Sequence, residues 1–554
     1  MKPLLYVIGL GFVLFSPIQL CAQSPSPSPS ATKETKKEPP EPVVSDHEIT
    51  IGGGKKIAYQ AVTGYLLVRD ETATQPAPAP PDASKNVPES KEKPAEKTEL
   101  SKGEPKEQIF FTAYQAKGVT DPSTRPVTFA FNGGPGSASI WLHLGALGPR
   151  RVLLSDRGEA LPPPYKLVDN DSTWLEESDL VFIDPVQTGF SRPIVGEEAK
   201  QFHSYKKDIA DVAEFIRLWL TRYKRWSSPK FLAGESYGTI RAAGLTNYLL
   251  DTSGISLNGV VLISSCLNTR TLSWFPGVEG NIPNNDAPYP LLLPTFAAAA
   301  WYHGRLAPEL ENRPLLDFLS EVEAFARAQY TQALAKGDRL TEAEKKDLAA
   351  QIARYSGLTP EYVETQNFRE TFPRFRKELL KDKRLMLGAY DARFTGAQLA
   401  LGGESSDFDP SEAAVLGPFS SAFNDYIRRE LNFESDLPYH PFANVFPWSF
   451  DSDVRPLDVI PALKTAMNRN PYMKVMICSG LYDLVTPYLG PEELVHEMDL
   501  LPSLAKNVRL NRYGGGHMMY IDKGAREQLK RDFAAFVRDS TNNNLTESAK
   551  PVGS

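Results

Sequence analysis

The sequence predicts an α/β fold in which a mostly parallel central sheet carries helices on both faces and a helical segment is inserted between core strands. Short apolar runs alternate with segments of helical spacing, as parallel strands and their crossover helices do. One long segment breaks this alternation with charged helical stretches and aromatic, proline-rich joints, which favours an insertion. The strand-like runs are residues 127–131, 179–183, 230–233, 260–263, 474–478 and 508–513.

The composition is that of a globular protein with a mild negative charge. The 554 residues are 41% hydrophobic, enough for a sizeable core, which excludes a wholly disordered chain. The 61 basic and 68 acidic residues give a net charge of −7, so a nucleic-acid partner is not expected. Cys21, Cys266 and Cys478 cannot form a disulfide framework, and we expect the last two to be free buried thiols.

The N-terminus is typical of a secretory signal. Lys2 supplies the positive start, and residues 4–15 form an apolar run shorter than the roughly 20 residues needed to span a bilayer. Residues 20–23, Leu-Cys-Ala-Gln, fit a cleavage site, so we expect the mature protein to be periplasmic or extracellular. Lipid modification of Cys21 is the alternative, but such sites favour a small preceding residue and Leu20 is bulky. No later segment is long and apolar enough to predict a membrane helix.

Two polar stretches rich in proline, lysine and glutamate flank a strand-like region near the N-terminus. Residues 47–69 alternate like strands around three glycines, so the second stretch is expected to be a disordered loop within an edge hairpin. The expected order is a signal peptide at 1–23, a disordered linker at 24–45, a first core part at 46–267 with the disordered insertion at 71–106, a mostly helical lid at 268–450, a second core part at 451–540 and a polar tail at 541–554.

A candidate nucleophile lies in residues 234–238, Gly-Glu-Ser-Tyr-Gly, which fit the G-x-S-x-G elbow. The pattern alone is weak, since chance gives about 0.2 matches in a chain of this length. Its context strengthens it, because a strand-like run precedes Ser236 and a helix-compatible run follows, at residues 240–250. A structural serine in a glycine-rich turn is the alternative interpretation.

A nucleophilic serine needs a base, and in this type of site the acid and then the histidine follow the serine along the chain. His517 follows three glycines after a strand-like run, whereas His303 and His440 fall in the expected lid and His496 in a solvated helix. His517 is therefore the predicted base. Asp483 follows the run at 474–478 and is the predicted acid that orients the imidazole, although a loop aspartate can also be a turn former.

The glycine-rich loop at residues 132–136, Asn-Gly-Gly-Pro-Gly, follows the strand-like run at 127–131. Glycines let a backbone approach a substrate closely, and an oxyanion hole needs backbone donors aimed at the developing charge. The predicted pair of donors is the N–H of Gly134 and that of Tyr237, the residue after the nucleophile.

Taken together, these motifs resemble the serine carboxypeptidase family, α/β-hydrolases that remove C-terminal residues from peptides. The resemblance covers about residues 108–540, with a lid insertion in the corresponding place, and an exported, bacterial-type member is expected. The matching segments are residues 131–137 for the family's N-G-G-P-G-[CS]-S loop, 147–149 for its L-G-P, 179–191 for its D-x-P segment, 234–238 for its nucleophile box and 516–518 for its G-H-M.

The resemblance implies a triad of Ser236, Asp483 and His517. It also implies that Asn132, Gly133 and Glu235 bind the C-terminal carboxylate of the substrate. The family uses a second glutamate for this task, and that position is Ala146 here. Two close carboxyls share a proton and can donate it to a carboxylate at acidic pH, so the alanine predicts an optimum that is not strongly acidic.

The predicted function is that of an exported serine-type carboxypeptidase acting on peptides through an acyl-enzyme. An esterase, amidase or acyltransferase with the same triad is the alternative, and Ala146 is the feature that favours it. An inactive binding protein is the remote alternative. No spacing of Cys, His or Asp predicts a metal or cofactor site, and side-chain preference and oligomeric state are left open.

Overall fold

The computed structural model describes residues 39–69, 103–273, 284–403, 406, 408–450 and 456–542. The expected signal peptide with Cys21, most of the expected insertion at 71–106 and nearly all of the expected tail lie outside these residues.

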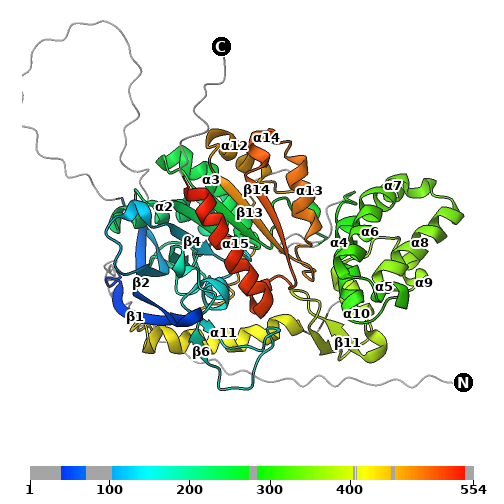
Figure 1. Cartoon of the computed structure of the whole chain (residues 1–554), viewed down its shortest axis with the longest axis horizontal. Coiled ribbons are helices and arrows are strands. Elements are labelled where there is room, and N and C mark those ends of the chain that lie inside the picture. Colours follow the sequence, from blue (N-terminus) through cyan, green and yellow to red (C-terminus); the bar gives the residue numbers. More distant parts are fainter. Residues whose placement is uncertain are drawn as a thin grey trace, which may run out of the picture. The chain divides into compact units, whose positions relative to one another are not determined.

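A ten-stranded mixed sheet forms the centre of the fold (Figure 1). The strands from β7 to β14 pair in parallel in the order β7-β4-β9-β10-β13-β14, and β1, β2 and β3 extend the sheet in antiparallel pairs, with β8 beside β3. The bounds are Val43–Ile51 for β1, Lys55–Arg69 for β2, Pro105–Ala116 for β3, Val127–Phe131 for β4, Asp179–Ile183 for β7, Arg192–Pro193 for β8, Lys230–Glu235 for β9, Gly259–Ile263 for β10, Lys474–Gly480 for β13 and Val508–Tyr513 for β14.

The expected strands are confirmed, and the sheet is mostly parallel as predicted. All six apolar runs are strands, because each is short, β-branched or aromatic and bounded by turn residues. At the antiparallel edge the strands reach further than expected. β1 begins at Val43 and β3 at Pro105, so each takes in the end of a stretch that was expected to be disordered.

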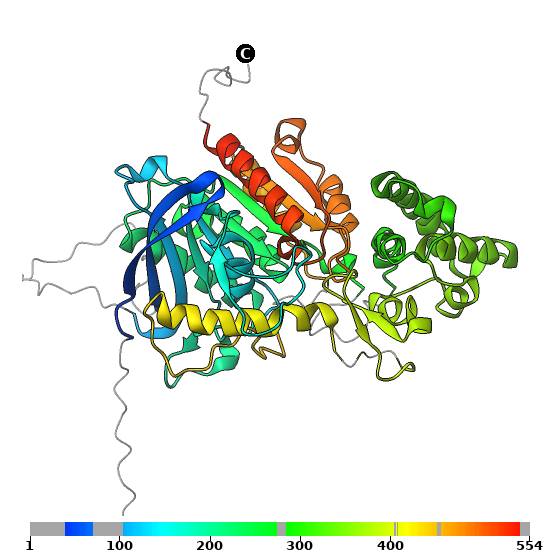
Figure 2. The ribbon, with the colours of Figure 1, turned by 60° about the horizontal axis from the view of Figure 1, so that its bottom comes forward.

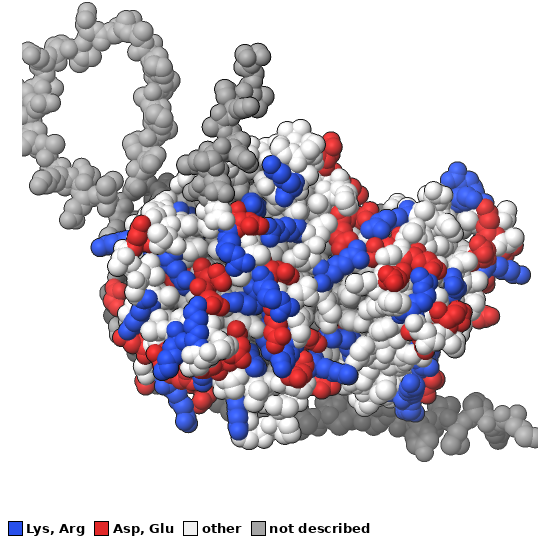
Figure 3. Space-filling model, viewed as in Figure 1, with Lys and Arg blue, Asp and Glu red and all other residues white. Residues whose placement is uncertain are grey.

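Helices cover both faces of the sheet (Figure 1). One face packs against α2 (Tyr205–Arg222), α3 (Tyr237–Ser253) and α12 (Ile460–Arg469), whose apolar sides join one buried cluster. The other face packs against α15 (Lys523–Thr541) and α11 (Pro410–Arg429) in a second cluster. On the face drawn in Figure 3, basic and acidic side chains intermingle rather than forming a patch of one sign. None of the described helices is long and apolar enough to cross a membrane.

The helical segment between β10 and β13 is inserted as predicted, but it divides into two parts. Residues 284–403, here called the lid, hold α4 to α10 around a separate buried cluster, which apolar side chains from residues 481–489 of the second core part join. α11 instead lies along the main sheet (Figure 2), because Val415, Phe419 and Phe423 pack into the core below it. The lid helices are Pro288–Tyr302 (α4), Pro308–Glu311 (α5), Leu315–Phe325 (α6), Thr331–Lys336 (α7), Glu342–Ser356 (α8), Pro360–Thr365 (α9) and Phe372–Glu378 (α10).

A group of ion pairs ties the lid to the sheet domain. Arg512 on β14 donates to Glu323 of α6 at 2.7 Å and to Glu492 of α13 (Leu489–Glu497) at 2.6 Å. The hydroxyl of Tyr488 donates to the same Glu323 at 2.9 Å. Glu323 and Glu492 are buried, so these partners must stay together to offset the cost of removing their charges from water.

Candidate functional site

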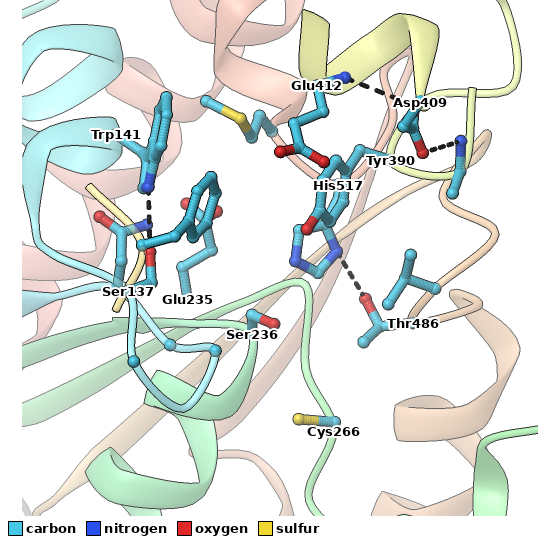
Figure 4. A pocket seen from close by; sticks show the side chains of 18 of the residues that line it. Ser137, Trp141, Glu235, Ser236, Cys266, Tyr390, Asp409, Glu412, Thr486 and His517 are labelled. Carbon is cyan, nitrogen blue, oxygen red and sulfur yellow. Dashed lines mark hydrogen bonds between the residues drawn. The ribbon is translucent and has the colours of Figure 1, made fainter. Parts of the chain in front are cut away.

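The nucleophile elbow is built where β9 passes directly into α3. Ser236, between them, has φ 60° and ψ −129°, a strained conformation for a residue with a side chain. The turn needs small neighbours, because a Cβ on Gly234 would lie 2.1 Å from the carbonyl oxygen of Gly238. The Ser236 N–H donates to the carbonyl of Ile263 at 3.0 Å, which fixes the turn to the neighbouring strand. The hydroxyl therefore projects into the cavity (Figure 4).

His517 faces the same cavity as Ser236 (Figure 4). Its Nδ1 lies 2.7 Å from Oδ2 of Asp483, which leaves Nε2 as the ring nitrogen for the nucleophile. Asp483 is fully buried and its Oδ1 accepts the N–H groups of Val485 and Thr486, both at 2.9 Å. An imidazole held in this way carries its proton on Nδ1 and can accept one on Nε2.

The electrostatics of His517 suit a base. Burial alone would lower the pKa of His517, but the carboxylate of Asp483 outweighs it, with help from Glu235, and the net pKa is raised. The Asp483 carboxylate would thus stabilise the imidazolium that forms when the serine proton moves.

The glycine-rich loop lies directly against the elbow. A Cβ on Gly133 would be 2.4 Å from the amide nitrogen of Tyr237, so the two backbones approach as closely as only glycine permits. Gly134 has φ 101°, which likewise favours glycine. Because Tyr237 is the first residue of α3, its N–H is one of the helix's unpaired N-terminal donors. The loop and the helix start thus bring backbone donors to the nucleophile.

A buried ion pair, which the sequence analysis missed, lies beneath the place where the glycine-rich loop meets the start of α3. Arg241 of α3 donates from Nε to Asp208 of α2 at 2.9 Å and from a terminal nitrogen to the Asn132 carbonyl at 2.7 Å. The Tyr237 hydroxyl donates to the same carboxylate at 3.2 Å. The pair therefore couples the loop, the elbow helix and α2. A charged residue five positions after the nucleophile could have drawn attention to it, but its partner lies in another helix.

Glu235 sits beside the nucleophile with a partner that the sequence analysis did not identify. The Tyr520 hydroxyl donates to Oε2 of Glu235 at 2.5 Å, and Asn132 bonds both side chains. Burial raises the pKa of Glu235 to about 7, although His517, Tyr520 and Asn132 pull it down. Ala146 is buried, so Glu235 has no second carboxyl from that position. Its partner is the hydroxyl of Tyr520 instead.

The lid supplies one contact to the base that sequence reasoning could not foresee. The carbonyl of Tyr390 accepts the backbone N–H of His517 at 2.5 Å, and the two rings lie 5.3 Å apart. Gly516 makes this approach possible, because a Cβ there would be 2.2 Å from the same carbonyl. From the core side, the Ser264 hydroxyl donates to the carbonyl of His517 at 2.6 Å. The backbone of His517 is thus bonded to the lid on one side and to the sheet domain on the other.

The cavity that these groups share has a volume of about 660 Å³. Its wall is largely apolar and aromatic, and Glu412 of α11 adds a half-buried carboxylate that the sequence analysis missed (Figure 4). The predicted residues that line it are Asn132, Gly133, Gly134, Glu235, Ser236 and His517. The other considered histidines do not line it: Nε2 of His303 bonds the Ala392 carbonyl at 2.7 Å, His440 pairs through its backbone with Gly189, and His496 lies on α13.

The remaining sequence expectations concern thiols and metals. Cys266 and Cys478 are free and buried, as expected. They belong to the clusters on opposite faces of the sheet, so the structure keeps them apart. Within the described part of the chain, no group of three or more His, Cys, Asp or Glu side chains could hold a metal ion.

Comparison with known proteins relates this site to one family. The family model described as serine carboxypeptidase matches residues 99–279. Serine carboxypeptidase-like 33 from Arabidopsis thaliana is 31% identical over 150 residues, which are 26% of this chain and 29% of that protein. Carboxypeptidase Y homolog A from Talaromyces stipitatus is 30% identical over 140 residues, 25% of this chain and 22% of that protein. The chain therefore matches less than a third of the length of either relative.

The crystal structure of a prohormone-processing carboxypeptidase from Saccharomyces cerevisiae superposes with a TM-score of 0.50 and 16% sequence identity, over 87% of this chain and 91% of that one. At this identity the likeness shows the shared fold. The family match over residues 99–279 and the curated relatives show that this part of the chain is similar to serine carboxypeptidases, and the chain has an α/β-hydrolase fold.

Proposed function

We propose that the protein is an exported, bacterial-type serine carboxypeptidase that removes C-terminal residues from peptides. The observation that carries the proposal is the position of Glu235. This buried acid, bonded to Asn132, lines the same cavity as Ser236 and His517. A protonated carboxyl and an amide beside a nucleophile can bind a free carboxylate while the adjacent peptide bond is attacked.

The proposed reaction uses these groups in turn. Nε2 of His517 takes the hydroxyl proton of Ser236 as the serine oxygen attacks the carbonyl carbon of the last peptide bond. The carbonyl oxygen becomes an oxyanion and accepts hydrogen bonds from the N–H groups of Gly134 and Tyr237. When the intermediate collapses, the C–N bond breaks and His517 gives its proton to the departing amine. Water, activated by the same imidazole, then releases the acyl group and restores the serine.

The test compares matched peptides with free and amidated C-termini across pH 4 to 8. We expect the free acid to be trimmed with a much lower KM than the amide, because only the acid can bind Glu235 and Asn132 as a carboxylate. Activity should rise as His517 loses its proton, and KM for the acid should rise as Glu235 loses its own at a pKa of about 7. The optimum is therefore expected near neutral pH. Equal rates on acid and amide would instead favour the esterase or amidase alternative, which Ala146 already supports.

A second prediction concerns the substrate's side chains. Glu412 places a carboxylate among aromatic residues of the cavity wall, and the basic side chains that line the cavity are His517 and Arg376, of which Arg376 pairs with Asp409. We expect a terminal Lys or Arg side chain to be favoured, and Glu412→Gln to lower kcat/KM for such peptides by about tenfold, the loss of one charge-assisted hydrogen bond. Peptides ending in Leu should be unaffected. Glu527→Gln, on α15 outside the cavity, is the control, and an equal loss on both kinds of peptide would contradict the assignment.

The proposed export rests on the apolar run at residues 4–15 and the cleavage site that follows it. The mature protein is expected outside the cytoplasm, with an N-terminus near Ala22 or Gln23. Fractionation of the producing cells and mass spectrometry of the intact protein check both points, and an uncleaved protein in the cytoplasm would overturn the proposal.

A further inference from the structure

Ala146 removes the second carboxyl that the family pattern pairs with Glu235, yet the pocket beside Glu235 is filled. Tyr520, which follows the catalytic histidine by three residues, packs its ring over Gly145 so closely that a Cβ there would lie 2.6 Å from it. Tyr520 is fully buried and its hydroxyl bonds Oε2 of Glu235. A large residue after the histidine and small residues at 145 and 146 thus occur together.

We propose that Tyr520 is a positioning residue that holds Glu235 ready to receive the C-terminal carboxylate of the substrate, in place of a second carboxyl. The inference rests on the proposed function, because it assigns a part in carboxylate binding. Tyr520 does not line the cavity and acts only through Glu235.

The direction of the hydrogen bonds supports this assignment. The backbone N–H of Leu142 donates to Oδ1 of Asn132 at 3.0 Å, which turns the amide nitrogen of Asn132 toward Tyr520 and Glu235. The oxygen of Tyr520 therefore accepts from Asn132, and its proton goes to Oε2 of Glu235. With Oε2 occupied as an acceptor, the proton of a neutral Glu235 belongs on Oε1, the oxygen that remains for the substrate.

Several groups set the protonation of Glu235. Burial raises the pKa of Glu235, and the carboxylate of Asp483 adds to this effect. His517 and the hydrogen bonds of Tyr520 and Asn132 lower it, and the ring of Tyr390 faces the same group from the lid. Removing the Tyr520 hydroxyl takes away one donor to the carboxylate, so the pKa of Glu235 must rise further. The Tyr520 hydroxyl lowers the pKa of Glu235, whereas a second carboxyl in its place would raise that pKa by repulsion between the charges.

The test is Tyr520→Phe, which keeps the ring and deletes the hydroxyl. The hydrolysis of an activated ester, p-nitrophenyl acetate, is inhibited with N-acetyl-phenylalanine or with its amide between pH 5 and 9. We expect the variant to bind the acid about fivefold to tenfold more weakly at pH 6, because Glu235 is no longer held. The pH at which acid binding is lost should move upward, while inhibition by the amide stays unchanged.

Tyr513→Phe is the matched control, since it deletes another buried hydroxyl, one bonded to Asp532 at 2.8 Å and outside the cavity. If Tyr520→Phe weakens acid and amide alike, or leaves the pH profile in place, Tyr520 is only a packing residue and the inference fails. If the wild-type protein already binds acid and amide equally, the proposed carboxypeptidase function fails first. The two failures are thus distinguishable within one set of measurements.

Discussion

Replacing Ser236 with alanine is expected to abolish the release of C-terminal residues, with a loss in kcat on the order of a millionfold. The other hydroxyls at the start of α3 are engaged elsewhere, that of Tyr237 with Asp208 and that of Thr239 with the carbonyl of Ser236, so without the serine oxygen no acyl-enzyme can form. Single-turnover assays on a free-acid peptide measure the residual rate. Mass spectrometry after treatment with a fluorophosphonate should find the label on Ser236 in the wild type and none in the variant.

The control is Ser356→Ala, which removes a fully buried hydroxyl in α8 that donates to the carbonyl of Ile352 and accepts the N–H of Leu358. Its activity should match the wild type. A Ser236→Ala variant that keeps more than about one thousandth of kcat would require a different nucleophile.

Asp483→Asn is expected to lower kcat by about ten thousandfold with little change in KM. Oδ1 of Asp483 accepts two backbone N–H groups, so the oxygen of an asparagine would stay at that place. The amide NH₂ would then face Nδ1 of His517 and force the proton of the imidazole onto Nε2. In that tautomer the imidazole cannot accept the serine proton.

The pH profile separates this effect from a simple loss of stability. The substitution also removes the charge that raises the pKa of His517, so the acidic limb of kcat should move to lower pH. Asp532→Asn, on α15 and away from the cavity, should leave both kcat and the profile unchanged. An Asp483→Asn variant with more than about a tenth of the wild-type kcat would rule out the orienting role.

The elements that could be predicted from the sequence are those that local chemistry decides. Ser236 needs small residues around a tight turn, and His517 and Asp483 each follow a short apolar strand, so their patterns are visible in the chain itself. The structure places all three after parallel strands of one sheet, β9, β13 and β14, with β10 between the first two, at the edge where loops converge.

The residues that sequence reasoning missed depend on contacts between distant segments. Tyr520 reaches Glu235 across 285 positions, and Tyr390 bonds His517 through a carbonyl group, which no residue type reveals. α11 has the spacing of an amphipathic helix, but spacing does not say which core its apolar side joins. The sequence therefore could not divide the inserted segment between lid and sheet domain.

The lid contacts the sheet domain through Glu323 and the catalytic histidine through the carbonyl of Tyr390, so we expect catalysis to depend on its position. If the ion pairs around Arg512 and the apolar packing of the lid against residues 481–489 both loosen, the carbonyl of Tyr390 would leave the N–H of His517. The base then loses a backbone anchor although Ser236 and the sheet are intact. Moderate heating is therefore expected to lower the activity before the sheet melts, whereas added salt should have little effect because Glu323 and Glu492 are buried.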